Sequence, residues 1–194
     1  MGPRTLHFKI KTPPMPVRTL PLFAALLAAS LAAPAAAQAP PLTAVPALDL
    51  DRYVGVWHEI ARYENFFERM CARDVTATYS RNADGTIKVV NACRKADGGT
   101  ASADGVARMV TPPSKLEVRF APDWLAWLPM VWANYWVIEL ADDYSYAVVS
   151  EPNREYLWLL ARDPRMSDAA YERIVGRLRE RGFDPGKLVR NPPA

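Results

Sequence analysis

Histidine is almost missing from the 194-residue sequence, which contains only His7 and His58. A Ser-His-Asp or Cys-His catalytic set depends on a histidine held beside the nucleophile. The sequence also lacks a Gly-x-Ser-x-Gly motif, the ligand spacing of a zinc site and a glycine-rich phosphate loop. We therefore expect a protein that is not an enzyme and that has no catalytic residues, no cofactor and no metal site.

A surplus of positive charge is missing as well, once the N-terminal segment is set apart. Residues 1–18 carry four cations and no acid, residues 20–33 are mostly apolar, and residues 35–37 are alanines suited to cleavage. This pattern predicts a signal peptide over residues 1–37, because the apolar run is shorter than the roughly 20 residues of a membrane anchor. Its removal leaves 20 Lys and Arg against 21 Asp and Glu, so the net charge falls from +3 to near −1. Nucleic acid is not an expected partner, since no basic stripe remains to neutralise phosphates.

Cysteine is scarce, with two residues in the chain and none near the expected cleavage point. A lipid anchor at the new N-terminus is therefore not expected. We expect a soluble periplasmic protein, with association with the outer membrane as a further expectation. The turn residues 82–85 predict a hairpin, and pairing Tyr79 with Ile87 across it brings Cys71 near Cys93. In an oxidising compartment these two cysteines predict a disulfide.

Short strands at regular spacing dominate the rest of the chain. Residues 38–47 are rich in Pro and Ala and predict an unstructured leader, so residues 48–194 form the expected single domain. Ser167 begins and Gly182 ends a predicted helix with one apolar face, suited to packing outside a sheet. Eight strands with mostly short connections predict an all-β fold, an antiparallel up-and-down barrel with this C-terminal helix outside. The expected strands are residues 53–63, 75–79, 87–91, 103–110, 115–120, 135–140, 144–149 and 155–162.

Three motifs resemble the signature regions of the lipocalins. They are Gly55-Val56-Trp57 on the first strand, Asp143-Tyr144-Ser145-Tyr146 at the seventh, and Arg162 at the end of the eighth. The fuller runs 57–62 and 153–162 resemble the branch that contains bacterial lipocalins and apolipoprotein D. The resemblance implies that Arg162 lies across the Trp57 ring and closes the barrel base, so Gly55, Trp57 and Arg162 are expected to be structural. It also implies binding of fatty acids and lysophospholipids.

The period-two alternation set by Trp57 and Arg162 predicts which side chains face the interior. Most are apolar or aromatic, which suits an acyl chain. Glu59 and Glu139 share the inward parity, and each is expected to bind a ligand's polar head, to pair with a tyrosine hydroxyl, or to form a structural salt bridge. A glycosidase-like role for the two carboxylates is a weaker alternative. The expected ligand-binding residues are Glu59, Ala61, Ala77, Tyr79, Met109, Val118, Phe120, Tyr135, Val137, Tyr156 and Trp158.

The connection over residues 122–132 is far more apolar than an ordinary loop. Three interpretations remain open: a rim that touches a lipid surface, a lid folded over the barrel, or a contact between subunits. The sequence thus predicts a monomeric or homodimeric carrier or scavenger of small hydrophobic ligands, in envelope lipid transport or stress. The alternative is a membrane-surface or protein-interaction module that uses residues 122–132.

Overall fold

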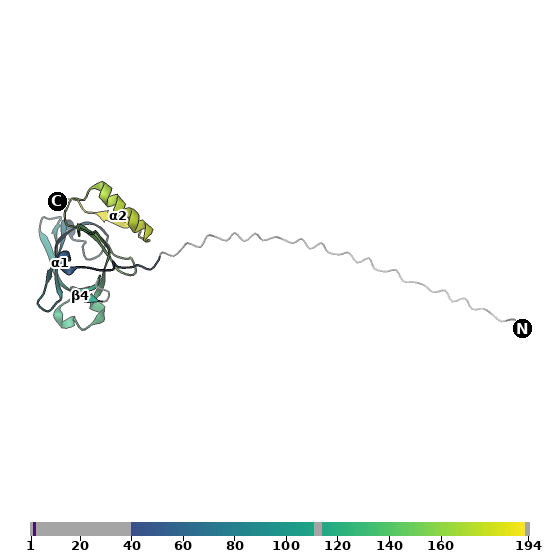
Figure 1. Ribbon diagram of the computed structural model, residues 1–194, viewed down its shortest axis with the longest axis horizontal. Coiled ribbons are helices and arrows are strands. Elements are labelled where there is room, and N and C mark those ends of the chain that lie inside the picture. The colour runs from purple at the N-terminus through teal and green to yellow at the C-terminus, as the bar shows by residue number, and fades with distance from the viewer. Residues whose placement is uncertain (1, 3–39, 111–113, 193–194) are drawn as a thin grey trace. The chain divides into compact units, whose positions relative to one another are not determined.

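The fold is known from a computed structural model, which describes residue 2, residues 40–110 and residues 114–192 (Figure 1). Apart from residue 2, the predicted signal peptide lies outside the described residues. Among the helices of the described residues, none is long and apolar enough to cross a membrane.

The strands form a closed antiparallel barrel, which confirms the predicted fold class. The strand order is β2-β3-β4-β5-β6-β7-β8-β1-β9, and pairing of β1 with β2 closes the ring. Because the strands alternate in direction, the β1–β2, β3–β4, β5–β6 and β7–β8 connections share one end of the barrel, which we call the mouth. The strands are β1 (Gly55–Tyr63), β2 (Cys71–Arg81), β3 (Ile87–Lys95), β4 (Thr100–Val110), β5 (Lys115–Arg119), β6 (Ala133–Leu140), β7 (Tyr146–Ser150), β8 (Leu157–Ala161) and β9 (Leu188–Arg190).

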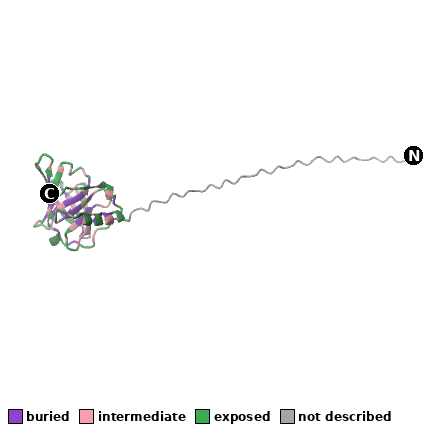
Figure 2. Cartoon of the chain, turned by 90° about the horizontal axis from the view of Figure 1, so that it is seen from above, coloured by how far each residue is buried: buried purple, intermediate pink, exposed green. Residues whose placement is uncertain are grey.

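Two apolar cores lie on the two faces of the curved sheet. The inner core fills the barrel around Trp57 and is covered at the base by α1 (Leu50–Tyr53). The outer core lies beneath α2 (Asp168–Glu180), whose Ile174 and Leu178 pack against strand residues such as Leu159. Figure 1 shows α2 outside the barrel, as predicted, and Figure 2 shows buried residues concentrated in the strands. Three short 3₁₀ helices, η1 (Asp123–Leu125), η2 (Pro129–Val131) and η3 (Pro185–Lys187), lie in the connections.

A β-bulge in β1 reverses the alternation on which the inward assignment depends. Glu59 pairs with Leu160 of the inner core, whereas Ala61 pairs with Leu159 of the outer core, so an extra residue lies between them. An extra residue moves every later side chain to the opposite face. The prediction that Ala61 faces the interior is therefore wrong.

A second bulge, in β6, acts in the same way. Val137 pairs with Val149 of the inner core, but Glu139 pairs with Val148 of the outer core. Glu139 therefore lies outside the barrel, where Arg177 of α2 donates to its carboxylate at 2.6 Å. Of the interpretations offered for Glu139, the structural salt bridge and the pairing with a tyrosine hydroxyl are both confirmed, since the Tyr146 hydroxyl donates to Glu139 at 2.8 Å. Its inward orientation is wrong.

The hairpin of β2 and β3 contains the predicted disulfide between Cys71 and Cys93, with Cα atoms 5.5 Å apart. The expected register is wrong by two residues, since Tyr79 pairs with Val89 rather than with Ile87. Two register shifts between Cys71 and Thr76 compensate for the difference and bring the cysteines together.

The leader is not unstructured over its described part, residues 40–47. It has no helix or strand, yet Leu42 is buried and the Val45 amide donates to Val137 O at 2.8 Å. Arg181 of the α2 C-terminus donates to Thr43 O at 2.8 Å. The segment is ordered because its backbone groups find partners on the barrel, even though its Pro and Ala content suits a linker.

Candidate functional site

The base of the barrel is closed by a contact between Trp57 of β1 and Arg162, which directly follows β8. The Arg162 guanidinium lies 3.9 Å from the centre of the Trp57 ring and donates to four backbone carbonyls, including Val56 O at 2.8 Å. Gly55 has φ +103°, and a Cβ there would lie 3.2 Å from Arg162 Nη1. Glycine is needed at this position both for its backbone conformation and for the approach of the guanidinium. This geometry is the one implied by the resemblance.

Three tyrosine hydroxyls meet above Trp57 in the inner core. The Tyr135 oxygen lies 2.7 Å from that of Tyr53 and 2.8 Å from that of Tyr79. Burial raises the pKa of Tyr53 and Tyr135 well above the ordinary value, and it raises the pKa of Tyr79 to about 12. The three phenols therefore stay neutral. Their hydroxyls are hydrogen-bonded to one another, as is usual for polar groups buried in an apolar core.

A second group of aromatic rings lies toward the mouth. Trp158 packs against the inner core, and Tyr156 stacks on it with ring centres 5.8 Å apart. Phe67, from the β1–β2 connection, lies 5.9 Å from Tyr156. We call that connection, residues 64–70, the mouth loop.

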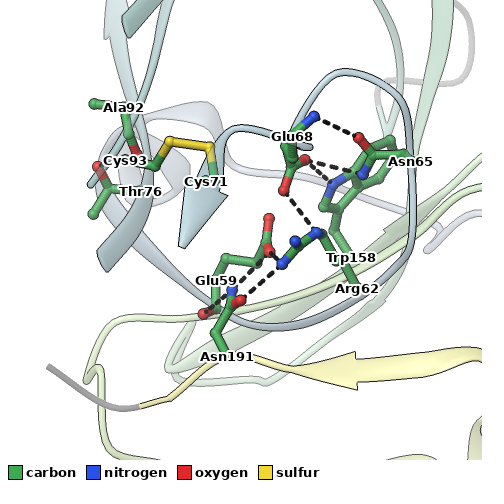
Figure 3. Close-up of a disulfide and its surroundings, with 10 residues drawn as sticks. All are labelled: Glu59, Arg62, Asn65, Glu68, Cys71, Thr76, Ala92, Cys93, Trp158 and Asn191. Carbon is green, nitrogen blue, oxygen red and sulfur yellow. Dashed lines mark hydrogen bonds and ion pairs between the residues drawn. A yellow bond between two sulfur atoms is a disulfide. The ribbon is translucent and has the colours of Figure 1, made fainter. Parts of the chain in front are cut away.

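Below the mouth loop, a polar cluster is buried at the point where one edge of β1 stops pairing with β2 and begins to pair with β9. The Glu59 carboxylate is 7% exposed and accepts from Arg62 Nη1 at 3.0 Å and from Asn191 Nδ2 at 2.7 Å. Arg62 Nε lies 3.1 Å from Glu68 Oε2, and Glu68 Oε1 accepts from Trp158 Nε1 at 2.9 Å (Figure 3). Burial, and next the Glu68 carboxylate, raise the pKa of Glu59 to about 8. Both causes favour the protonated form of Glu59 over the carboxylate.

Most of the predicted ligand-binding residues face the interior, although their role in binding is not established by this orientation. Met109 and Phe120 differ from the others because they are not buried, with 46% and 44% of their surfaces exposed. Ala61 is the exception in direction. The inner-facing residues are Glu59, Ala77, Tyr79, Val118, Tyr135, Val137, Tyr156 and Trp158.

Four residues of this interior were not among the predicted ones. The strand expected over residues 53–63 begins only at Gly55, and Tyr53 is instead the last residue of the short helix α1. The alternation that places Glu59 and Ala61 inside places Arg62 outside, because the bulge has no signature in the sequence. Glu68 and Asn191 reach the cluster from a loop and from the tail, where period-two reasoning does not apply. The one local signal was for Tyr53, an aromatic residue four positions before Trp57, whose ring centre lies 5.0 Å from that of Trp57.

The apolar connection after β5 is anchored at one tryptophan and exposed at two others. Trp132 donates from its indole to Ala126 O at 2.8 Å and lies under the Arg108 guanidinium at 4.0 Å. Trp124, Trp127 and Met130 are 73%, 76% and 85% exposed. We call these three residues the Trp patch. It belongs to the mouth end, because β5 ends and β6 begins there.

Two surface pockets, of about 460 and 670 Å³, lie outside the barrel. The first lies beside the N-terminal end of α2 and the tail, lined by residues such as Arg165 and Arg190. The second is lined by polar and apolar residues in equal number around Arg119 and Phe120. Neither is lined by the tyrosine cluster or by the stacked rings at the mouth.

Comparison with known proteins connects this geometry to a family. The model of the lipocalin-like domain family matches residues 48–193. Temperature-induced lipocalin-1 of Arabidopsis thaliana is 36% identical over 152 residues, which cover 76% of this chain and 81% of the relative. Outer membrane lipoprotein Blc of Escherichia coli K12 is 35% identical over 176 residues, covering 89% and 96%. Apolipoprotein D of Macaca fascicularis is 35% identical over 151 residues, covering 73% and 75%.

The solved structures share the fold at lower identity. Insecticyanin of Manduca sexta superimposes with a TM-score of 0.61 at 20% identity, covering 80% of this chain and 86% of the other.

Proposed function

We propose that this chain, which belongs to the lipocalin family, carries or scavenges a fatty acid or a lysophospholipid in the interior of its barrel. Lipocalins bind small hydrophobic ligands and are generally not enzymes. The observation that carries the proposal is the continuous path of aromatic and aliphatic side chains from the tyrosine cluster to Trp158 and Tyr156. Each methylene that leaves water along such a path contributes about 0.8 kcal/mol.

The same path predicts how a ligand is accommodated. An acyl chain enters at the mouth, beside Tyr156 and Trp158, which are only partly buried. The tyrosine hydroxyls and Glu59 then offer hydrogen bonds to a polar group, which supports ligand-binding roles for Glu59, Tyr79 and Tyr135.

A direct test is native mass spectrometry of the protein purified from the periplasm, before and after organic extraction of its lipid. We expect a co-purifying lipid that extraction removes, and uptake of one hexadecanoic acid or lysophosphatidylcholine by the extracted protein. If the protein carries no lipid and the extracted protein takes up neither compound, the carrier function is wrong.

We propose a periplasmic location for the carrier. The disulfide supports an oxidising compartment, and the relative Blc is named as an outer membrane lipoprotein. This chain has no cysteine near the expected cleavage point, so we propose that any contact with a membrane is made by protein side chains rather than by a lipid anchor.

The Trp patch supports such a contact, with a lipid surface as the partner. Tryptophan is favoured at the interface between lipid and water, and Trp124 and Trp127 face solvent beside the barrel mouth. Phe66 and Phe67 of the mouth loop are exposed at the same end. A surface that binds lipid there places the mouth where a lipid ligand enters or leaves.

The double variant Trp124→Ser/Trp127→Ser is predicted to weaken binding to vesicles of phosphatidylethanolamine and phosphatidylglycerol by at least tenfold. The reason is that each indole gains on the order of 2 kcal/mol when its apolar surface leaves water. Vesicle co-sedimentation measures the change. Val56→Ser removes an exposed apolar side chain at the base and is expected to leave binding unchanged; equal loss in both variants contradicts a specific role for the Trp patch.

A further inference from the structure

The barrel seam is incomplete next to the buried polar cluster. One edge of β1 pairs with β8, and the other pairs with β2 only from Gly55 to His58. Beyond that point β9 takes the same edge, from Ala61 to Tyr63. Toward the mouth, β1 and β2 therefore separate, and Glu59 lies at the position where they do so.

The mouth loop spans this separation and is fastened to the barrel mainly through Glu68. One oxygen of Glu68 pairs with Arg62 of β1, and the other accepts from the indole of Trp158 of β8. Asn65 braces Glu68 from within the loop through two hydrogen bonds. The other ring contact from the loop, Phe67 on Tyr156, leaves Phe67 largely exposed.

The charge balance of the cluster depends on one proton. Arg62 is the cation that contacts both carboxyls, Glu59 and Glu68. With Glu59 protonated, the Glu68 carboxylate and the Arg62 guanidinium balance. With Glu59 ionised, two carboxylates share one guanidinium in a site that water hardly reaches, which is unfavourable. The remaining polar groups that face Glu59 are the uncharged Asn191 amide from the tail and the Tyr79 hydroxyl from β2.

We propose that Glu59, Arg62, Glu68 and Asn191 form a proton-operated latch, which holds the mouth loop closed over the interior and releases it, and the bound ligand, as the pH rises. The latch deepens the carrier function and rests on it for the ligand. Opening exposes Glu59 to water, where its proton is held less tightly.

Proton linkage fixes the direction and range of the effect. The pKa of Glu59 is about 8 in the closed state and returns toward the ordinary carboxyl value in the open state. At pH values between these two pKa values, closure is therefore accompanied by the uptake of a proton. In that pH range the equilibrium constant for opening rises by up to about tenfold per pH unit. Above about pH 8 both states have lost the proton, so opening becomes independent of pH.

The first test uses the ligand-free protein, so that it does not depend on the carrier function. The indole N–H resonance of Trp158, assigned by its absence in Trp158→Phe, reports on the hydrogen bond to Glu68. We expect it to titrate with a midpoint near pH 8 in the wild type and not to titrate in Glu59→Gln. Its hydrogen exchange, relative to Glu59→Gln at the same pH, is expected to accelerate at least tenfold from pH 6 to pH 8.

The second test measures the dissociation rate of the fluorophore N-phenyl-1-naphthylamine by stopped flow. We expect the dissociation rate of the wild type to rise at least tenfold from pH 6 to pH 8 and to stay constant above pH 8. In Glu59→Gln we expect a slow dissociation rate that does not change with pH. Glu139→Gln is the matched control, because Glu139 also pairs with an arginine but lies outside the barrel; it is expected to keep the wild-type rise.

The outcomes separate the two proposals. A wild type that binds no fluorophore contradicts the carrier function, while the indole signal still decides the latch. An indole that does not titrate, or a dissociation rate that is flat while the indole titrates, overturns the latch. If Glu59→Gln fails to fold, Glu68→Gln replaces it: removing the second carboxylate is expected to move the indole midpoint to lower pH, and an unchanged midpoint overturns the proposal.

Discussion

Replacing Trp57 by alanine is expected to lower the free energy of unfolding by about 4 kcal/mol. Trp57 is fully buried at the base of the inner core, where Tyr53 lies 5.0 Å away and the Ala77 backbone pairs with it across the seam. Truncation leaves a cavity that the short strands cannot collapse, because α1 and Arg162 hold the base in place. Urea unfolding followed by circular dichroism measures the loss.

Arg162 is expected to contribute to the free energy of unfolding through the same contact. Arg162→Ala removes the cation over the ring and four charge-assisted hydrogen bonds, so we expect a loss of about 3 kcal/mol, with about 1 kcal/mol of coupling to Trp57→Ala in a double-mutant cycle. Arg162→Lys is expected to recover less than half, since an ammonium cannot reach the ring and the carbonyls together.

Matched surface variants make this prediction specific. Trp124→Ala and Arg173→Ala change the same residue types at exposed positions and are expected to alter stability by less than about 0.5 kcal/mol. If Trp57→Ala costs no more than Trp124→Ala, the base contact does not stabilise the fold as described.

The barrel was predictable from the sequence because its strongest signals are local or recur at known spacing. Alternation identified the eight barrel strands, and the caps and apolar face identified α2. The contact of Trp57 with Arg162 joins residues more than a hundred positions apart, and the family resemblance supplied it. The disulfide followed from the hairpin, even though the expected register was two residues wrong.

The parts that were missed depend on pairing between distant strands. The bulges in β1 and β6 arise where the register with β8 and β7 changes, and nothing in the runs around Ile60 or Ile138 marks the change. They moved Ala61 and Glu139 to the outer face and brought Arg62 inside. β9 has only three residues, too few to show alternation, so the contribution of Asn191 to the interior was invisible.

The substitution Val118→Trp is expected to weaken ligand binding by at least thirtyfold. Val118 is partly buried against the inner core, and its strand neighbours on β4 and β6 are the small residues Ala107 and Ala133. An indole placed between two alanines occupies the space that an acyl chain would take. The cost to stability is expected to be about 1 kcal/mol, within the range of overpacking in a core that can relax toward the mouth.

Val106→Trp is the matched control for this substitution. Val106 lies on β4 one residue before Ala107, so its side chain points to the outer face, next to Lys88 and Arg119. It adds the same volume to the same barrel without entering the interior. Thermal unfolding of both variants identifies any loss of binding that comes from misfolding.

The most direct measurement is the titration of N-phenyl-1-naphthylamine into wild type, Val118→Trp and Val106→Trp at pH 6.5, followed by displacement with hexadecanoic acid and lysophosphatidylcholine. A lipid-carrying interior predicts that the wild type and Val106→Trp bind the fluorophore with the same affinity and release it to at least one of the two lipids. It also predicts that folded Val118→Trp binds at least thirtyfold more weakly. Wild-type affinity in Val118→Trp, or no displacement by either lipid in the wild type, would contradict it.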